Sequence, residues 1–338
     1  MGVVKTKNVP VLRFSEFSDP WMMDRIDNFV KRVSNPVTVE PNTFYREIGV
    51  RSHGKGIFHK EPVTGKSLGN KRVFWVHPKA FVVNIVFGWE QAVALTTATE
   101  EGFIASHRFP MFVPIGKKSD LDFLLLFFLR KRGKYLLELA SPGGAGRNKT
   151  LGQSEFAQLE VTLPALAEQK KIAAFLAVVE KKLDALRRQG EQLHAYKRGV
   201  MQKIFSQELR FNADDGSGFP DWEEHEFEQI VFRVADKIDI NKSDVLLPCI
   251  ELDSLESGTG RLLTSYDCST QVSIKGKFKA GDVLFGKLRP YLRKYHQPSF
   301  QGACSSEIWV LRGTGITQKF LYYLVQTNRF DGGVNQFV

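Results

Sequence analysis

The chain repeats part of its own sequence with a period near 200 residues. LRF at residues 12–14 is followed by DPW at 19–21, and LRF at 209–211 is followed by FPDW at 219–222. Four further matches occur in the same order: NIVFG at 84–88 with DVLFG at 282–286, Gly102 and Ser106 with Gly302 and Ser306, DFL at 122–124 with KFL at 319–321, and Gly143-Gly144 with Gly332-Gly333. Periods of 20 to 50 residues are typical of solenoids, so this longer one indicates a duplicated domain.

The segment between the two copies has a different character. Residues 163–205 contain no proline beyond Pro164 and only two glycines, Gly190 and Gly199. Their apolar side chains follow the a/d spacing of a coiled coil, with Gly190 in the one missing position: Ile172, Leu176, Val179, Leu183, Leu186 and Leu193. We call these six residues the seam. A helix of about 40 residues is roughly 60 Å long, so the seam needs another long helix beside it.

The fold class that these patterns predict is α+β, with two mixed α/β domains separated by a long coiled-coil-type helix. Residues 80–86, 282–285 and 308–311 are expected to form strands, and residues 122–139 and 319–326 helices. The predicted divisions are a first domain at 1–160, a helical spacer at 161–207 and a second domain at 208–338.

Composition and charge narrow the classes of function. Lys and Arg outnumber Asp and Glu by 47 to 37, a net charge of +10 that suits a polyanion such as nucleic acid. Cys249, Cys268 and Cys304 lie far apart, which argues against a zinc site and a disulfide framework and favours a reducing cytoplasm. The longest apolar run, residues 123–129, is far shorter than the roughly 20 residues of a membrane helix, so we expect a soluble protein.

Catalytic motifs are not recognisable. GGAGRNKT at 143–150 places Asn148 where a phosphate-binding loop has its second glycine. Glu251, Asp253 and Glu256 could be imagined around magnesium, although a solvated strand edge and turn explains them better. A glycine-rich cofactor turn and the Asn/Asp-Pro-Pro-aromatic tetrapeptide of amino-methyltransferases are both missing, and the histidines form no H-x-x-x-H pair. The sequence therefore predicts binding and no metal or catalytic site.

Basic residues in turn-rich stretches are the candidate DNA-binding groups. Lys and Arg neutralise phosphates, and Arg also reads guanine edges. The alternative for each residue is an ordinary surface charge, as we expect for the paired cations on the long helix. The candidates are Arg46, Arg51, His53, Lys55, Lys71, Arg72, Arg147, Lys149, Lys287, Arg289, Arg293, Lys294 and, from the repeat, Ser306.

The long helix and the segment after it resemble a known family. Residues 163–176 read LPALAEQKKIAAFL, residues 197–208 read KRGVMQKIFSQE, and LRF and FPDWE follow at 209–211 and 219–223. This pattern is similar to the central helix and second recognition domain of type I restriction-modification specificity subunits. The resemblance covers essentially the whole chain, and it is most specific in the helix.

The resemblance implies a division of labour. Each target-recognition domain would read one half of a split site in double-stranded DNA, and the helix would set the distance between the halves. Modification subunits with S-adenosylmethionine would methylate one adenine per half-site, and restriction subunits would add ATP- and magnesium-dependent translocation and cleavage. No cofactor is then expected on this chain.

One departure from the family pattern concerns the helix. The family has a second conserved helix, antiparallel to the first, after the second recognition domain, and the sequence ends before it. The seam would then lack its partner, which predicts a homodimer or assembly with modification subunits.

Three other functions stay open on the sequence alone. A dimerising scaffold would bind modification subunits but read DNA poorly. A freestanding DNA-binding regulator would bind a defined site without any modification subunit. A metal-dependent nuclease would cleave DNA and lose that activity on Glu251→Ala substitution.

Overall fold

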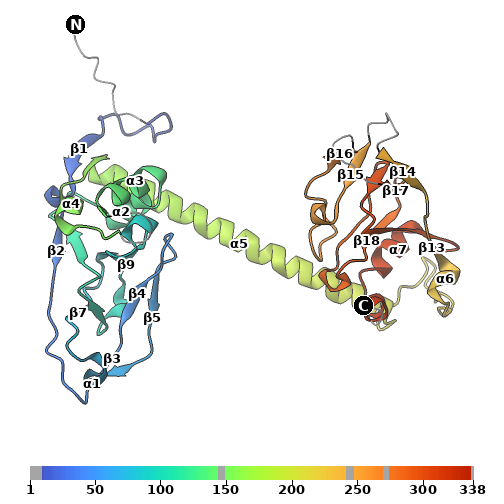
Figure 1. The fold of residues 1–338 in the computed structure, drawn as a ribbon, viewed down its shortest axis with the longest axis horizontal. Helices are drawn as coiled ribbons and strands as arrows, with labels where there is room; N and C mark the ends of the chain where they lie inside the picture. The colour runs from blue at the N-terminus through green and yellow to red at the C-terminus, as the bar shows by residue number, and fades with distance from the viewer. Residues whose placement is uncertain (1–9, 144–148, 241–246, 269–273, 336–338) are drawn as a thin grey trace, which may run out of the picture. The chain divides into compact units, whose positions relative to one another are not determined.

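A computed structural model describes residues 10–143, 149–240, 247–268 and 274–335 (Figure 1). The chain divides into two compact units, Met1–Ala185 and Leu186–Val338, which we call unit 1 and unit 2 and describe separately. Helix α5, Leu166–Phe205, contributes its first half to unit 1 and its second half to unit 2. The fold class is confirmed, because α5 lies in the chain between two regions rich in strands. The predicted domain boundaries stay a prediction.

The central sheet of unit 1 is a four-stranded antiparallel sheet in the order β2-β11-β8-β9, formed by Val30–Val33, Met111–Pro114, Phe81–Val83 and Val93–Leu95. Alternate side chains of these strands enter two different cores. Phe81, Val83 and Phe112 pack with the helices, whereas Val82 and Met111 pack on the other face. Because strand side chains alternate with a period of two, this sheet separates two hydrophobic layers.

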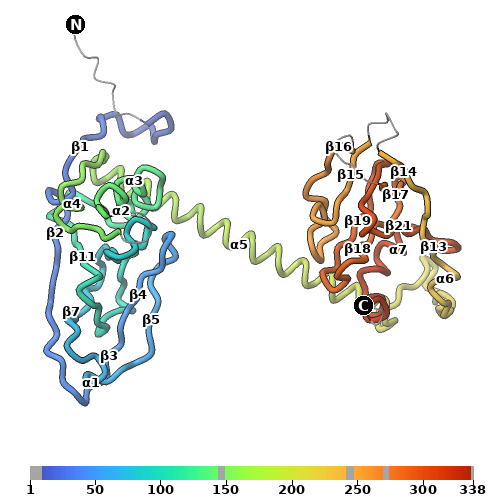
Figure 2. Tube along the Cα trace, in the orientation of Figure 1, coloured from blue at the N-terminus to red at the C-terminus, as the bar shows by residue number. Residues whose placement is uncertain are grey.

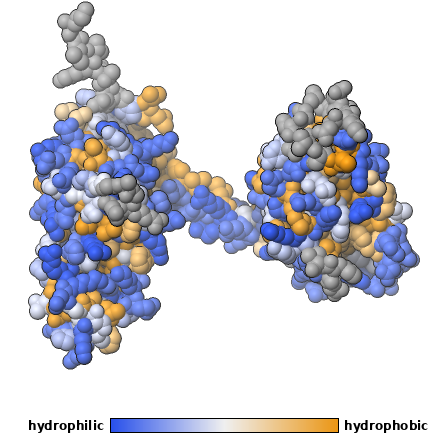
Figure 3. Space-filling model, in the orientation of Figure 1, coloured by the Kyte–Doolittle hydropathy of each residue, from blue (hydrophilic) through white to orange (hydrophobic). Residues whose placement is uncertain are grey.

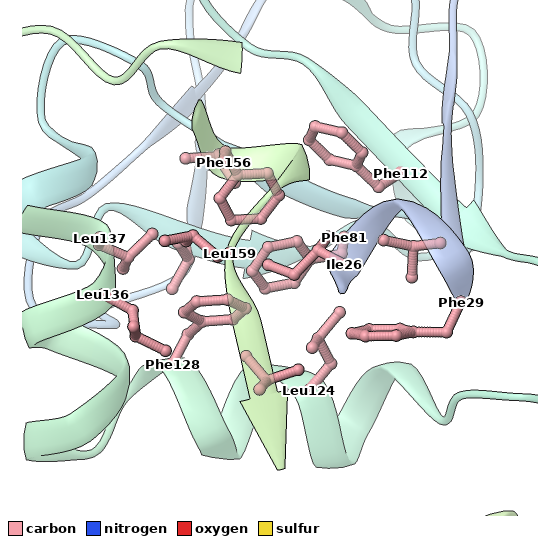
Figure 4. Close-up of a cluster of buried hydrophobic side chains, with 14 of the residues drawn as sticks. Ile26, Phe29, Phe81, Phe112, Leu124, Phe128, Leu136, Leu137, Phe156 and Leu159 are labelled. Carbon is pink, nitrogen blue, oxygen red and sulfur yellow. The ribbon is translucent and has the colours of Figure 1, made fainter. Parts of the chain in front are cut away.

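Helices cover one face of this sheet. Helices α2, α3 and α4 are Leu121–Phe128, Lys131–Leu139 and Gln153–Ala157. Phe81, Phe128 and Phe156 meet at the centre of this layer, with ring centroids 5.5–6.4 Å apart (Figure 4).

The rest of unit 1 consists of short ladders and single turns of helix. The ladders are β1–β12 (Met22–Arg25 with Glu160–Leu163), β3–β6 (Phe44–Tyr45 with Val63–Thr64), β4–β5 (Ile48–Val50 with Ile57–His59) and β7–β10 (Val73–Trp75 with Ile104–Ser106). The turns of helix are η1, α1, η2 and η3, at Ile26–Asn28, Gly65–Leu68, Gly88–Glu90 and Ala98–Glu100.

Unit 2 repeats the central sheet. The order β13-β21-β18-β19 is formed by Val231–Arg233, Ile308–Gly313, Val283–Gly286 and Tyr295–His296. A five-stranded sheet has the order β14-β17-β20-β15-β16, at Lys237–Asp239, Ile274–Phe278, Gly302–Cys304, Pro248–Ile250 and Tyr266–Asp267. The helices are α6, η5, η7, α7 and α8, at Phe227–Ile230, Leu252–Ser254, Pro290–Leu292, Gln318–Leu324 and Asn328–Asn335.

The common strand order supports the duplication, but it corrects the alignment of two segments. Phe112 of β11 and Leu311 of β21 hold the same position in the two sheets, because they pair with Arg32 of β2 and Arg233 of β13. On the other side Phe112 pairs with Phe81 and Leu311 with Val283. Phe81 therefore corresponds to Val283, and Asn84 to Gly286 rather than to Asp282. Gly332 and Gly333 lie inside α8, whereas Gly143 lies in an isolated bridge with Lys149. Both matches were wrong, because similar letters in short segments do not report the register of strands.

Two predicted elements are shorter than expected. Residues 122–139 form two helices, with Arg130 in an extended conformation between them. The helices pack so closely that a Cβ on Gly133 would lie 2.3 Å from the Phe127 carbonyl oxygen. Residues 80–86 contain only the strand β8, because the Asn84 side chain accepts a hydrogen bond from the Val86 amide and turns the chain. The predicted strands at 282–285 and 308–311 and the helix at 319–326 are present with small shifts of their ends.

The predicted long helix is confirmed as α5, and unit 1 holds its first turn. Glu168 is 1% exposed and accepts hydrogen bonds from Arg13 and Trp21. Ile172 and Leu176 are partly buried, whereas Val179, Leu183, Leu186 and Leu193 are 38–60% exposed. Figure 3 shows hydrophobic side chains at the surface of this helix. Most of the seam is therefore uncovered in the single chain.

We expect Phe128→Ala to lower the free energy of unfolding of unit 1 by about 3–5 kcal/mol, because it leaves a cavity among Phe81, Phe127 and Phe156. Native-state hydrogen exchange of the amides in β8 and β11 would measure the loss. Leu139→Ala, at an exposed position of α3, is the control and should change that free energy by less than about 0.5 kcal/mol. Equal effects of the two substitutions would contradict the central position of the Phe128 ring in this core.

Candidate nucleic-acid interface

A basic groove of about 760 Å³ lies on unit 1. It is bordered by the β4–β5 hairpin, by the turn after β8 and by the chain after β10. The described residues that line it include no acidic side chain; they are Gly49, Val50, Arg51, Ser52, His53, Lys55, Phe58, Lys60, Lys71, Asn84, Val86, Phe87, Ser106, His107, Arg108 and Phe109. A concave surface lined by one sign of charge concentrates counter-ions of the other sign. The groove therefore favours a polyanion.

The β4–β5 hairpin, whose backbone Figure 2 traces, carries Arg51 and Lys55 in the turn between its two strands. Gly49 pairs with Phe58 across the ladder, and a Cβ on Gly49 would lie 2.2 Å from the Phe58 ring, so only glycine allows the ring to lie there. The Arg51 guanidinium lies 4.9 Å from the centroid of the same ring. Because a cation over an aromatic face is held without neutralising its charge, Arg51 can still meet an anion.

The tip of the hairpin is held in a strained conformation. His53 has φ +60°, in the left-handed region that non-glycine residues seldom adopt, and Gly54 and Gly56 also have positive φ. The His53 and Gly54 amides donate to the carbonyls of Glu90 and Gln91, and the Ser52 hydroxyl donates to the Glu90 carboxylate. These bonds hold exposed Arg51, His53 and Lys55 in a defined arrangement before any ligand arrives.

A buried carboxylate organises two lysines of the groove. Glu47 is 7% exposed, and both Lys60 and Lys71 form ion pairs with it. The two ammonium groups share one negative charge, so the cluster retains a net positive charge. More than a third of each lysine side chain is exposed, which leaves both able to contact a phosphate.

Polar side chains with little exposure also line the groove. Asn84 and Ser106 are 8% and 6% exposed, and the Nδ1 atom of His107 is buried without a hydrogen-bond partner in the described structure. Sequence reasoning identified Arg51, His53, Lys55 and Lys71 but missed Lys60, His107, Arg108 and Asn84. His107 and Arg108 directly follow Ser106, which the repeat had singled out, so the sequence did contain a pointer to this segment.

The other candidates in unit 1 lie outside the groove lining. Arg46 lies over the Phe103 ring at 5.6 Å, Arg72 is exposed, and Lys149 lies 5.8 Å from the centroid of Trp89. Arg147 falls outside the described residues. Their contact with DNA stays a prediction.

The candidate DNA-binding residues of unit 2 are of two kinds. Lys287, Arg289 and Ser306 are exposed, and Arg289 has φ +53°. Arg293 instead pairs with Asp331 at 2.8 Å, and the Lys294 ammonium donates to the Leu252 carbonyl at 2.7 Å. The last two hold the unit together, so Lys287 and Arg289 are the stronger candidates for contacts with a ligand.

The carboxylates considered for magnesium have separate partners. Glu251 pairs with buried Lys275 at 2.5 Å, Asp253 accepts from the Tyr266 hydroxyl, and Glu256 pairs with Arg261. Among the residues with described positions, no group of three or more His, Cys, Asp or Glu side chains is placed to hold a metal ion. Cys249, Cys268 and Cys304 are buried free thiols, and burial raises the pKa of Cys304 to about 12.

Comparisons with known proteins agree with this chemistry. Residues 64–195 match the family model of the type I restriction modification DNA specificity domain. The type I restriction enzyme MjaVIII specificity subunit of Methanocaldococcus jannaschii is 22% identical over 242 residues. That match covers 63% of this chain and 54% of the relative, so the chain spans about half the length of this curated relative.

Two solved structures have a similar fold. The HsdS subunit of Thermoanaerobacter tengcongensis has a TM-score of 0.52 and 15% identity, over 94% of this chain and 81% of that chain. A chain from a structural study of complex assembly and conformational transition of the type I R-M system has a TM-score of 0.53 and 15% identity, over 90% of this chain and 78% of that chain. The matched family domain lies in unit 1 and the start of unit 2, so the chain is similar to type I restriction-modification specificity proteins over this region.

Proposed function

We propose that this chain is the non-catalytic DNA sequence-recognition subunit of a type I restriction-modification system. The observation that carries the proposal is the groove on unit 1, which is rich in cations, free of acidic lining residues and partly within the matched family domain. Exposed Arg51, Lys55 and Arg108 are suited to phosphates, which position a protein on DNA without reading its sequence. The recessed amide of Asn84 and hydroxyl of Ser106 are suited to the edges of bases.

Unit 2 would read the second half of a bipartite target. Its central sheet has the same strand order as that of unit 1, and Lys287 and Arg289 are exposed next to the end of β18. The different side chains of the two units would then recognise different bases, so the two halves of the target are expected to differ.

The exposed seam of α5 would bind other protein chains. Leu183 and Leu186 are about half exposed, and a stripe of this kind on a soluble helix marks an interaction surface. We propose that modification subunits dock there or that two copies pair through it, with restriction subunits added to the assembly. S-adenosylmethionine, ATP and magnesium would belong to those partner subunits, in the cytoplasm. Among the described helices, none combines the length and hydropathy of a membrane span.

The same seam supports a second candidate function. If the groove of unit 1 bound DNA poorly, the chain would be a dimerising scaffold for modification subunits. The exposed apolar residues of α5 favour this function as much as the first, so measurements on DNA must separate the two.

The proposed function predicts new adenine methylation in cells that express this chain with its matching modification subunit. Sequencing that detects modified bases should reveal a split motif. Two different halves would mean that both units read DNA in one particle, and two identical inverted halves would mean paired copies that each use one unit. No new methylation despite formation of the complex would favour the scaffold.

A second prediction concerns salt. The double substitution Arg51→Gln/Lys55→Gln should weaken binding to duplex DNA and reduce the slope of log K against log salt by about 0.9 for each lost phosphate contact. Fluorescence anisotropy at several salt concentrations would measure the slope. Lys181→Gln/Lys182→Gln, on the exposed side of α5, removes the same charge and should leave the slope nearly unchanged. If the helix variant lowered the slope and the groove variant did not, the DNA interface would lie on α5 and not in the groove.

A third prediction concerns self-association. The purified chain should sediment as a dimer at micromolar concentration, and Leu183→Glu/Leu186→Glu should make it a monomer, because two charges cannot be buried in an apolar seam without partners. Arg188→Glu, on the opposite side of the same helix, is the control and should remain a dimer. A wild-type chain that sediments as a monomer would leave modification subunits as the partners of the seam.

A further inference from the structure

Unit 2 carries an exposed turn between β18 and β19, residues 287–294, which we call the β18–β19 turn. Its counterpart in unit 1 is the turn between β8 and β9. The strand pair that closes the β18–β19 turn is Phe285 with Tyr295, and the pair that closes its counterpart is Val83 with Val93. Each turn also contains one turn of 3₁₀ helix, η7 in unit 2 and η2 in unit 1. The two turns therefore have the same length and correspond residue by residue.

This correspondence gives Leu288 a defined place. Leu288 takes the position of Val86, which lines the basic groove of unit 1. The Leu288 side chain is 47% exposed, and its neighbours Lys287 and Arg289 are exposed as well. Residues 283–295 contain no Asp or Glu, so an anionic ligand meets no like charge from this stretch of the chain.

The β18–β19 turn is held in a strained conformation. Arg289 and Arg293 have φ +53° and +48°, in the left-handed region that non-glycine residues seldom adopt. The Arg293 guanidinium donates to the Asn328 side chain and forms an ion pair with Asp331, and Pro290 is buried at the start of η7. Strain of this kind persists only where surrounding contacts hold it, and it is common at ligand sites. The side chains on the turn are thus positioned before a ligand arrives.

The surroundings of Leu288 favour nucleic acid over a protein partner. One exposed leucine is ordinary on a protein surface, but Tyr291 in the same turn is 63% exposed and cations lie on both sides of Leu288. The centre of a protein–protein interface is depleted in lysine and other charged residues, whereas cations contact the phosphates of DNA. The apolar surfaces that duplex DNA offers are the thymine methyl groups and the faces of its stacked bases. Proteins that unstack a base step do so with inserted apolar side chains such as leucine.

We propose that the β18–β19 turn inserts Leu288 between two stacked bases of the half-site that unit 2 reads. Lys287 and Arg289 would contact the phosphates beside the opened step, and the strained turn would hold Leu288 in place. The inference rests on the proposed function, because it requires unit 2 to bind DNA. It adds an activity to recognition: an enzyme that modifies a base must take that base out of the stack, and an opened step nearby lowers the cost of doing so.

The experiment uses the full chain in complex with its matching modification subunit. The probes are duplexes that carry the mapped methylation motif and contain 2-aminopurine at successive positions of each half-site, since 2-aminopurine fluoresces more strongly when it is unstacked. The fluorescence should rise at least about threefold at one step of one half-site, away from the methylated adenine. A complex that binds the duplex without any such rise would overturn the inference and leave the proposed function intact. A complex that does not bind the duplex at all would overturn both.

Variants of the chain then test the inserted side chain. Leu288→Ala should reduce the rise in fluorescence to less than about a third of the wild-type value, because alanine is too short to separate two bases. Phe232→Ala is the matched control: it removes a similarly exposed apolar side chain, 45% against 47%, from β13 at the opposite edge of the same sheet, and should retain the full rise. Both variants should keep the circular dichroism spectrum of the wild type. A full rise with Leu288→Ala would refute the insertion, and weaker binding of that variant would then assign Leu288 to a contact in the groove, such as a thymine methyl group.

Discussion

The pairing of β11 with β2 and β8 is the constraint on which the rest of unit 1 depends. Phe112 faces the helices and Met111 faces the opposite layer, and their partners Phe81 and Val82 divide in the same way. A shift of one residue in the register of β11 would turn each of its side chains to the opposite face, so Phe112 would leave the core with the helices and Met111 would enter it. Unit 2 divides likewise, with Leu311 and Val283 on one face and Val310 and Leu284 on the other.

This division places the basic groove. Ile48 and Val50 of β4 belong to the same hydrophobic core as Val82 and Met111. Apolar packing therefore holds the base of the hairpin whose turn carries Arg51, His53 and Lys55. Hydrogen bonds from the tip of the hairpin to Glu90 and Gln91 hold the tip against the segment that follows β8. Because the strain at His53 is held by these contacts, the hairpin tip would lose little conformational freedom on binding a ligand.

The two units differ in how the space beside the repeated Trp and Phe side chains is filled. In unit 2 the end of α5 fills the space between Trp222 and Phe320, and the unit is closed at that point by its own chain. In unit 1 the start of α5 borders the corresponding space through Glu168 and Ile172 but does not fill it. The same helix thus completes one unit with Phe205 of its last turn and lines a cavity in the other with its first turns.

The sequence by itself determined the duplication, the α+β class and the long helix, since these follow from matches and periodicities that many residues share. It also singled out Arg51, His53, Lys55 and Lys71, four residues that line the groove, because basic residues among turn residues are visible in a linear pattern. The tertiary structure alone decided that Lys60, His107, Arg108 and Asn84 join them, that Lys294 turns inward, and that Asn84 corresponds to Gly286. Strand register and the direction of a side chain depend on contacts between residues distant in sequence, and no local pattern records those contacts.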